Sequence, residues 1–119
     1  MRRAHPETEI HKAVMVHVAA RGVPRLVAWH TPNGGFRTPI EAKIFKSLGV
    51  KSGIPDLFLL HGGRLYGLEL KAPGGKPTET QLCTLAELHL AGAIVEVAIG
   101  LDEAIATLEA WGLLRGQMQ

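Results

Sequence analysis

The sequence lacks the motifs that identify several common classes of enzyme. Its one cysteine, Cys83, excludes a disulfide within the chain and a zinc site made of several thiolates. It has no His-Glu-x-x-His motif, no glycine-rich phosphate-binding loop and no serine nucleophile elbow. No metal-ligand spacing connects His5, His17, His61 and His89. Zinc proteases, P-loop enzymes and α/β-hydrolases are therefore not indicated.

Long apolar runs are also missing. The apolar runs span a few residues each, far below the ~20 that a membrane-spanning helix needs. Two arginines near the start have no apolar stretch behind them, so we expect no secretory signal. With 119 residues, of which 46% are hydrophobic, the chain suits a single domain over residues 1–119. We expect a cytoplasmic setting and no membrane partner.

Positive and negative charges occupy different parts of the chain, although the net charge is only +2. Residues 21–51 contain six lysines and arginines against one acid, whereas residues 79–109 contain six acids and no lysine or arginine. A basic patch attracts polyanions, and phosphate contacts dominate nucleic-acid affinity. The pattern favours a nucleic-acid partner. An ordinary solvated surface is the alternative, and the acidic stretch could instead face another protein.

Apolar periodicity and turn residues predict an alternation of helices and strands. Thr38 with Glu41, and Thr78 with Gln81, have the spacing of capping boxes, which open helices. Two apolar runs of strand length, joined by a Gly-Gly pair, predict a hairpin. The expected elements are a helix at 6–20, a strand at 26–30, a short helix at 39–48, strands at 56–61 and 64–71, a helix from 78 to about 90, a strand at 93–99 and a helix at 102–112.

The hairpin strands carry apolar residues on both faces. A sheet that is buried on both sides needs helices on both sides. We therefore predict an α/β fold in which helices flank a mixed sheet.

The Gly-Gly pair also predicts how the two hairpin strands face each other. If the pair forms a two-residue turn, counting back along both strands brings Asp56 opposite Glu69. Their Cβ atoms would then lie roughly 4.5–5.5 Å apart. Two like charges so close repel each other. A divalent cation such as magnesium, which prefers carboxylate oxygens, would offset that repulsion.

Lys71 lies two residues after Glu69, so the strand period of two places both side chains on one face. An ammonium beside a metal ion can orient or help to deprotonate a water molecule and can stabilise charge on a phosphate. The carbonyl of Leu70, between them, could add a metal ligand. The alternative is that Asp56 starts a strand for turn reasons and that Glu69 and Lys71 form a surface ladder.

The order of these motifs resembles the VRR-NUC family (virus-type replication-repair nucleases) of the PD-(D/E)xK superfamily. The resemblance rests on Gly-Ile-Pro-Asp at 53–56, Glu-Leu-Lys at 69–71 and Gln81, with similar residues at 30–35 and 71–75, and it covers about residues 5–105. It implies a restriction-endonuclease-like core in the order helix, three strands, helix, strand (αβββαβ), with one short helix added at 39–48.

The resemblance further implies metal-dependent hydrolysis of DNA phosphodiester bonds, which leaves a 5′-phosphate and a 3′-hydroxyl. Asp56 and Glu69 would hold the metal ion, expected to be Mg²⁺ with Mn²⁺ as a substitute. Lys71 would act on the attacking water. Gln81 matches the family's glutamine after Glu-x-Lys, although the capping box explains its position as well.

Family members also carry a glutamate in the first helix, four residues before a glutamine. Glu7 occupies the glutamate position in this sequence, with Glu9 as a nearby rival. His11 stands where glutamine is usual. Both acids could instead serve only to complement the helix dipole.

The candidates for DNA contacts lie in a loop after the first strand and in the basic stretch. They are His30, Asn33, Arg37, Lys43 and Lys46. Small family members are similar to Holliday-junction resolvases, which implies a homodimer that acts on branched DNA in DNA repair, and a phage or mobile-element origin. The alternative function is a nuclease-fold module that binds DNA without cutting it.

Overall fold

The computed structural model describes residues 6–32 and 38–116 of the chain. Helices and strands follow one another there in the order that the sequence predicts, and their bounds differ from the expected ones by no more than two residues. They are α1 (Pro6–Arg21), β1 (Val27–His30), α2 (Pro39–Ser47), β2 (Leu57–His61), β3 (Arg64–Lys71), α3 (Glu79–Leu90), β4 (Ile94–Ile99) and α4 (Leu101–Ala110). None of the helices within the described ranges is long and apolar enough to cross a membrane.

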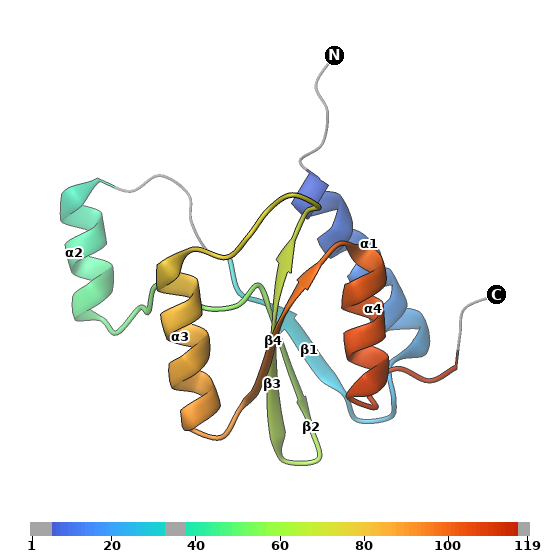
Figure 1. The fold of residues 1–119 in the computed structure, drawn as a ribbon. Coiled ribbons are helices and arrows are strands. Elements are labelled where there is room, and N and C mark those ends of the chain that lie inside the picture. The colour runs from blue at the N-terminus through green and yellow to red at the C-terminus, as the bar shows by residue number, and fades with distance from the viewer. Residues whose placement is uncertain (1–5, 33–37, 117–119) are drawn as a thin grey trace.

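The strands form one mixed sheet with the order β1-β2-β3-β4. β2 pairs antiparallel with both β1 and β3, while β3 and β4 are parallel neighbours. α1 and α4 pack on one face of the sheet and α3 packs on the other (Figure 1). The predicted α/β class, the mixed sheet and the αβββαβ order are therefore confirmed.

The core lies between the sheet and the α1–α4 pair. Leucines at alternate positions of β2 and β3 are fully buried on this side, because side chains along a strand point to its two faces in turn. Val14 of α1 and Leu108 of α4 complete the layer. Burial of each such side chain stabilises the fold by about 1.5–3 kcal/mol, so this layer fixes the positions of the strands.

The β2–β3 hairpin has the register that the Gly-Gly pair predicts, from His61 opposite Arg64 to Leu57 opposite Leu68. Both turn glycines have a positive φ, of 58° and 76°. A type I′ turn requires this conformation at both central residues, and its twist matches that of the strands it joins. The local choice of two glycines therefore sets the alignment of both strands.

The ladder ends one pair earlier than expected, so Asp56 is not a strand residue paired with Glu69. The Asp56 carboxylate instead accepts a hydrogen bond from the backbone N–H of Leu70, at 2.9 Å. A longer β2 would satisfy this N–H through its own backbone. The side chain of Asp56 thus takes the place of the next rung of the ladder.

The sheet is covered less completely than its two apolar faces predict. α3 packs on β4, whereas no helix of the described chain packs closely on the same face of β1 and β2. Val27, Trp29 and Leu60 are exposed there. The short helix does form as α2, with the predicted Thr38–Glu41 capping box, but it stands apart from the sheet (Figure 1). Phe58 of β2 is buried on this face, so the expectation of a sheet buried on both sides is wrong for β1 and for the turn end of β2.

Gly53 holds the chain close to α3 just before Asp56. Its φ is +76°, and a Cβ atom at this position would lie 2.6 Å from the backbone oxygen of Thr80. Gly49 also has a positive φ, +89°, but nothing lies within 4 Å of its Cβ position. Replacing each glycine by alanine therefore separates two costs. Backbone strain arises at both positions, whereas steric overlap arises only at Gly53.

We predict that Gly49→Ala lowers the free energy of unfolding by about 1–2 kcal/mol, the penalty of a left-handed conformation for an L-residue. Gly53→Ala should lower it by roughly 1–3 kcal/mol more, because the added methyl group overlaps α3. Urea denaturation of both variants measures the difference. Equal losses would contradict the close approach of this segment to α3.

Candidate active site

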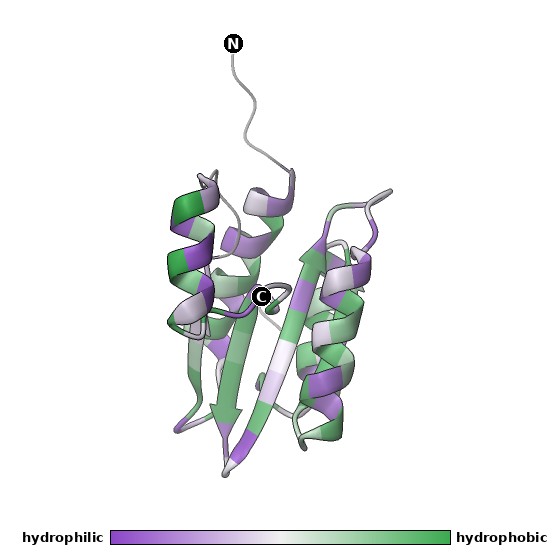
Figure 2. Ribbon diagram, turned by 90° about the vertical axis from the view of Figure 1, so that its left-hand side faces the viewer, coloured by the Kyte–Doolittle hydropathy of each residue, from purple (hydrophilic) through white to green (hydrophobic). Residues whose placement is uncertain are grey.

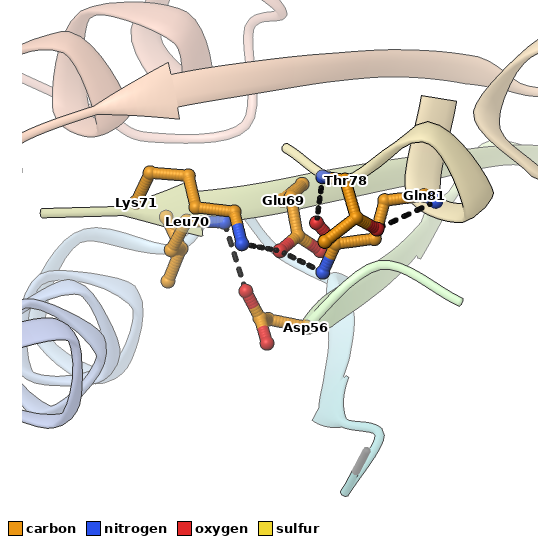
Figure 3. A network of polar contacts seen from close by, with 6 residues as sticks. All are labelled: Asp56, Glu69, Leu70, Lys71, Thr78 and Gln81. Carbon is orange, nitrogen blue, oxygen red and sulfur yellow. Dashed lines mark hydrogen bonds and ion pairs between the residues drawn. The ribbon is translucent and has the colours of Figure 1, made fainter. Parts of the chain in front are cut away.

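Four of the predicted site residues meet at the end of the sheet where β3 ends and β2 begins (Figure 3). Glu69 and Lys71 extend from β3, and Asp56 directly precedes β2. Gln81 reaches the same group from the first turn of α3. Residues that lie far apart in the sequence therefore form one polar network.

Asp56 is fixed by both its backbone and its side chain. Its carbonyl accepts hydrogen bonds from the backbone N–H of Thr31 at 2.9 Å and from Nδ1 of His30 at 2.8 Å. Its Oδ2 atom accepts the N–H of Leu70. Because a carbonyl can only accept, Nδ1 of His30 carries a proton in this hydrogen bond.

Glu69 is a carboxylate with only 1% of its surface exposed. Its Oε2 atom accepts a hydrogen bond from Nε2 of Gln81 at 2.9 Å and lies 3.4 Å from Nζ of Lys71. Its Oε1 atom is buried and has no hydrogen-bond partner within the described chain. Burial, followed by the negative charge of Asp56, raises the pKa of Glu69 to about 7, although Lys71 acts in the opposite direction.

Gln81 has both of the roles that its position suggests. Its backbone N–H donates to Oγ1 of Thr78, and its side-chain oxygen accepts the backbone N–H of Thr78, which completes a capping box. The amide nitrogen of the same side chain donates to Glu69. One residue therefore begins α3 and orients the buried carboxylate.

The oxygen atoms at this site suit a hard divalent cation. The unpartnered Oε1 of Glu69 and the neighbouring charge of Asp56 are both unfavourable without a positive charge in addition to that of Lys71. The N–H of Leu70 points to Asp56, and in a strand the carbonyl of the same residue points to the same side.

These two carboxylates and one backbone oxygen are the ligands that the site offers. Nowhere in the described ranges do three His, Cys, Asp or Glu side chains gather as a metal cluster. Mg²⁺ usually keeps several of its waters and binds through one or two carboxylates, so a small set of protein ligands fits it.

A hollow of about 330 Å³ opens beside Asp56, next to the first turns of α1. Glu7 lines it, whereas Glu9 lies outside the lining, exposed and paired with Lys12 at 3.9 Å. Of the two acids considered in the first helix, Glu7 is therefore the one that lies beside the site. The full lining is Glu7, Thr8, His11, Lys12, His30, Asp56 and Leu70.

His11, which stands where the family's glutamine is usual and was not among the predicted site residues, also lines this hollow. Its ring centroid is 4.3 Å from that of His30, in an edge-to-face arrangement. Burial, and after it the charge of His30, lowers the pKa of His11, which favours the neutral ring. The signal available in the sequence is its spacing of four from Glu7, which puts both residues on one face of a helix. The same face carries Thr8 and Lys12, which were also not predicted.

The residues predicted to bind DNA are only partly gathered at the site. His30 lines the hollow. Lys43 and Lys46 are exposed on α2, apart from it. Asn33 and Arg37 lie outside the described residues.

Two solved structures share the fold over nearly the whole chain. One, described as a "VRR_NUC domain protein", matches with a TM-score of 0.74 and 24% identity over 96% of this chain and 94% of its own. Another, described as a "VRR_NUC domain", has a TM-score of 0.64 and 21% identity over 91% of this chain and 99% of its own. No family model and no curated protein matches the sequence. The chain thus has the VRR_NUC fold that its motifs lead us to expect.

Glu69 should make the cation-free protein less stable as the pH rises. Its pKa of about 7 in the folded chain exceeds the ordinary value of 4.5, so the folded protein binds this proton more tightly than the unfolded chain does. The resulting stabilisation is complete below pH 4.5 and is lost as the pH rises to about 7. Wild type should therefore lose on the order of 2–3 kcal/mol relative to Glu69→Gln across this window.

Urea denaturation of wild type and Glu69→Gln with a chelator present, between about pH 5 and pH 8, measures this effect. His11, whose lowered pKa acts in the opposite direction, is present in both proteins, so its contribution cancels in their difference. A difference that stays constant over the whole pH range would contradict the raised pKa of Glu69.

Proposed function

We propose that the chain is a metal-dependent DNA endonuclease of the VRR-NUC family. The observation that carries the proposal is the buried Glu69 with one unpartnered oxygen, beside Asp56 and Lys71, on a VRR_NUC fold. Two neighbouring carboxylates do not stabilise a fold by themselves, because burial and mutual repulsion disfavour their charges. A bound cation, and the chemistry it serves, best explains their position at the end of an apolar sheet.

Asp56, Oε1 of Glu69 and the carbonyl of Leu70 would hold Mg²⁺ or Mn²⁺, since hard cations prefer oxygen ligands. When bound, the cation activates water and neutralises negative charge on a phosphate. The hydrogen bond from Gln81 restrains Oε2 of Glu69, which leaves Oε1 for the cation.

Lys71 would act on the water that attacks phosphorus. Its ammonium is mostly buried and lies 3.4 Å from Oε2 of Glu69, so its position is restricted to the edge of the cation site. There it can donate hydrogen bonds to the water or to a phosphate oxygen and stabilise the negative charge that develops. Addition of water and rupture of the bond to the 3′ oxygen leave a 5′-phosphate and a 3′-hydroxyl.

The hollow beside Asp56 would receive the phosphodiester. Lys12 supplies a positive charge in its lining, and charge-assisted hydrogen bonds to phosphate are strong. Glu7 supplies a carboxylate to the same lining, and the imidazole rings of His11 and His30 also face the hollow. The cation site and the hollow share Asp56, so a phosphate in the hollow would lie next to the cation.

For the substrate we propose branched DNA of the Holliday-junction kind, cut by a homodimer in DNA repair or phage replication. Lys43 and Lys46 on the protruding α2 would contact phosphates away from the site, since backbone contacts dominate affinity for DNA (Figure 1). Two strands are cut symmetrically when a two-fold axis relates two equivalent sites.

A second candidate function is a module of the same fold that grips DNA without cutting it. The observation in its favour is the sparse cation site, because no three acidic, histidine or cysteine side chains converge among residues 6–32 and 38–116. The two functions differ in one outcome, cleavage of the bound DNA.

We predict that the protein cuts labelled four-way junctions, in the presence of Mg²⁺ or Mn²⁺, in preference to flaps, single strands and linear duplex. Asp56→Asn and Lys71→Ala should each lower the rate at least about 100-fold, because one removes the charge of a cation ligand and the other the ammonium at the reacting water. Asp102→Asn and Lys76→Ala make the same chemical changes at exposed positions outside the site and should cut like wild type.

Equal unfolding temperatures would show that the site variants are folded. Tight binding of junctions without cleavage by wild type would favour the DNA-binding module. Cleavage by Asp56→Asn and Lys71→Ala at the wild-type rate would contradict the assigned site.

A further inference from the structure

Asp56 lies beyond the last paired residues of the sheet. The β1–β2 ladder ends at His30 opposite Leu57, and the β2–β3 ladder ends at Leu57 opposite Leu68. The sheet itself is largely apolar, as the green segments of the strands in Figure 2 show. Pro55, the preceding residue, has no backbone N–H to donate. The position of Asp56 therefore depends on contacts outside the two ladders.

The neighbouring strand ends supply these contacts. The carbonyl oxygen of Asp56 accepts the backbone N–H of Thr31 at 2.9 Å and Nδ1 of His30 at 2.8 Å. Its carboxylate accepts the backbone N–H of Leu70 at 2.9 Å. A carbonyl oxygen has two lone pairs, so Thr31 and His30 together satisfy it. Thr31 and Leu70 donate through backbone groups, which nearly any residue supplies, whereas the bond from His30 requires a particular side chain.

A second ring restrains that side chain. The ring of His11 on α1 lies edge-to-face against the ring of His30, with centroids 4.3 Å apart and planes at 81°. Because aromatic pairs have preferred geometries, this contact limits how the ring of His30 can rotate. Turning the ring over would replace Nδ1 by a carbon atom and break the bond to Asp56. The two histidines thus connect α1 to Asp56.

The hydrogen bond also restricts what His30 can do for DNA. It commits Nδ1 to the protein, so this nitrogen is not available to a phosphate. The rest of the ring is exposed and lines the hollow beside Asp56. The sequence predicts a DNA contact for His30, whereas its bond to Asp56 indicates a role in holding that residue. The first role would change the affinity for DNA, and the second would change the affinity for the cation.

We propose that His30 is a positioning residue, which holds Asp56 where its carboxylate can bind the cation. The inference rests on the cation site of the proposed function. Groups that hydrogen-bond to metal ligands typically change metal affinity 10–100-fold when they are removed. Since His30 acts through a single bond to the main chain of the ligand, we expect an effect of about 10-fold.

Calorimetric titration of Mn²⁺ into the chelator-treated protein, without DNA, tests the proposal. His30→Leu removes the donor and should bind Mn²⁺ about 10-fold more weakly than wild type. In His30→Asn the amide nitrogen occupies the place of Nδ1, because both atoms are bonded to Cγ, and the affinity should stay within about 3-fold of wild type. His61→Leu removes an imidazole at the turn end of β2 and should bind Mn²⁺ like wild type.

Hydrogen exchange provides a measurement that needs no cation. In the metal-free protein, His30→Leu should speed exchange of the Leu70 N–H at least about 5-fold, because its acceptor, the carboxylate of Asp56, is held less firmly. His30→Asn should leave this rate near that of wild type. The N–H of Leu68, which lies within the β2–β3 ladder, should be unchanged in both variants.

The outcomes separate this inference from the proposed function. Unchanged Mn²⁺ affinity in His30→Leu, together with weaker DNA binding, would overturn it in favour of a DNA contact. Equal weakening in His30→Leu and His30→Asn would overturn it as well, because the donated hydrogen bond would then not matter. A wild type that binds no Mn²⁺ would contradict the proposed cation site. The Leu70 exchange rate would then decide the role of His30, and an unchanged rate in His30→Leu would overturn it.

Discussion

The buried carboxylate of Glu69 is the constraint on which the rest of the site depends. It lies near the end of an inner strand of an apolar sheet with Asp56 beside it, so both its burial and its neighbour disfavour its negative charge. One amide and one ammonium, from Gln81 and Lys71, compensate Oε2. Oε1 has no such partner in the described structure. The negative charge of the site is therefore neutralised only when the site takes up a further positive charge. At low pH this charge is a proton, and in our proposal it is a divalent cation at neutral pH.

The period of two along β3 lets one strand serve the core and the site together. Leu68 and Leu70 point to the α1–α4 layer and anchor the strand, while Glu69 and Lys71 point to the opposite face. Asp56 then joins this face to the hollow beside α1. Packing forces on one side of the sheet thus hold the polar groups on the other side at fixed positions.

The parts of the fold that depend on local chemistry were predictable from the sequence. The Gly-Gly turn set the hairpin register, and the capping boxes marked where α2 and α3 begin. The end of the β2 ladder was not predictable, because a side chain of Asp56 replaces a backbone rung there. His11 was named only as a departure from the family's glutamine, because its place in the hollow depends on how α1 packs on the strand ends. Periodicity likewise could not show that α3 leaves Trp29 uncovered.

Calorimetric titration of Mn²⁺ and Mg²⁺ into the chelator-treated protein, without DNA, tests the central claim most directly. The account predicts that wild type binds the cation and that Asp56→Asn, which keeps the shape of the side chain but removes its charge, binds it at least about 10-fold more weakly. Absence of binding to wild type, or equal binding by wild type and Asp56→Asn, would contradict a cation site built around the buried carboxylate.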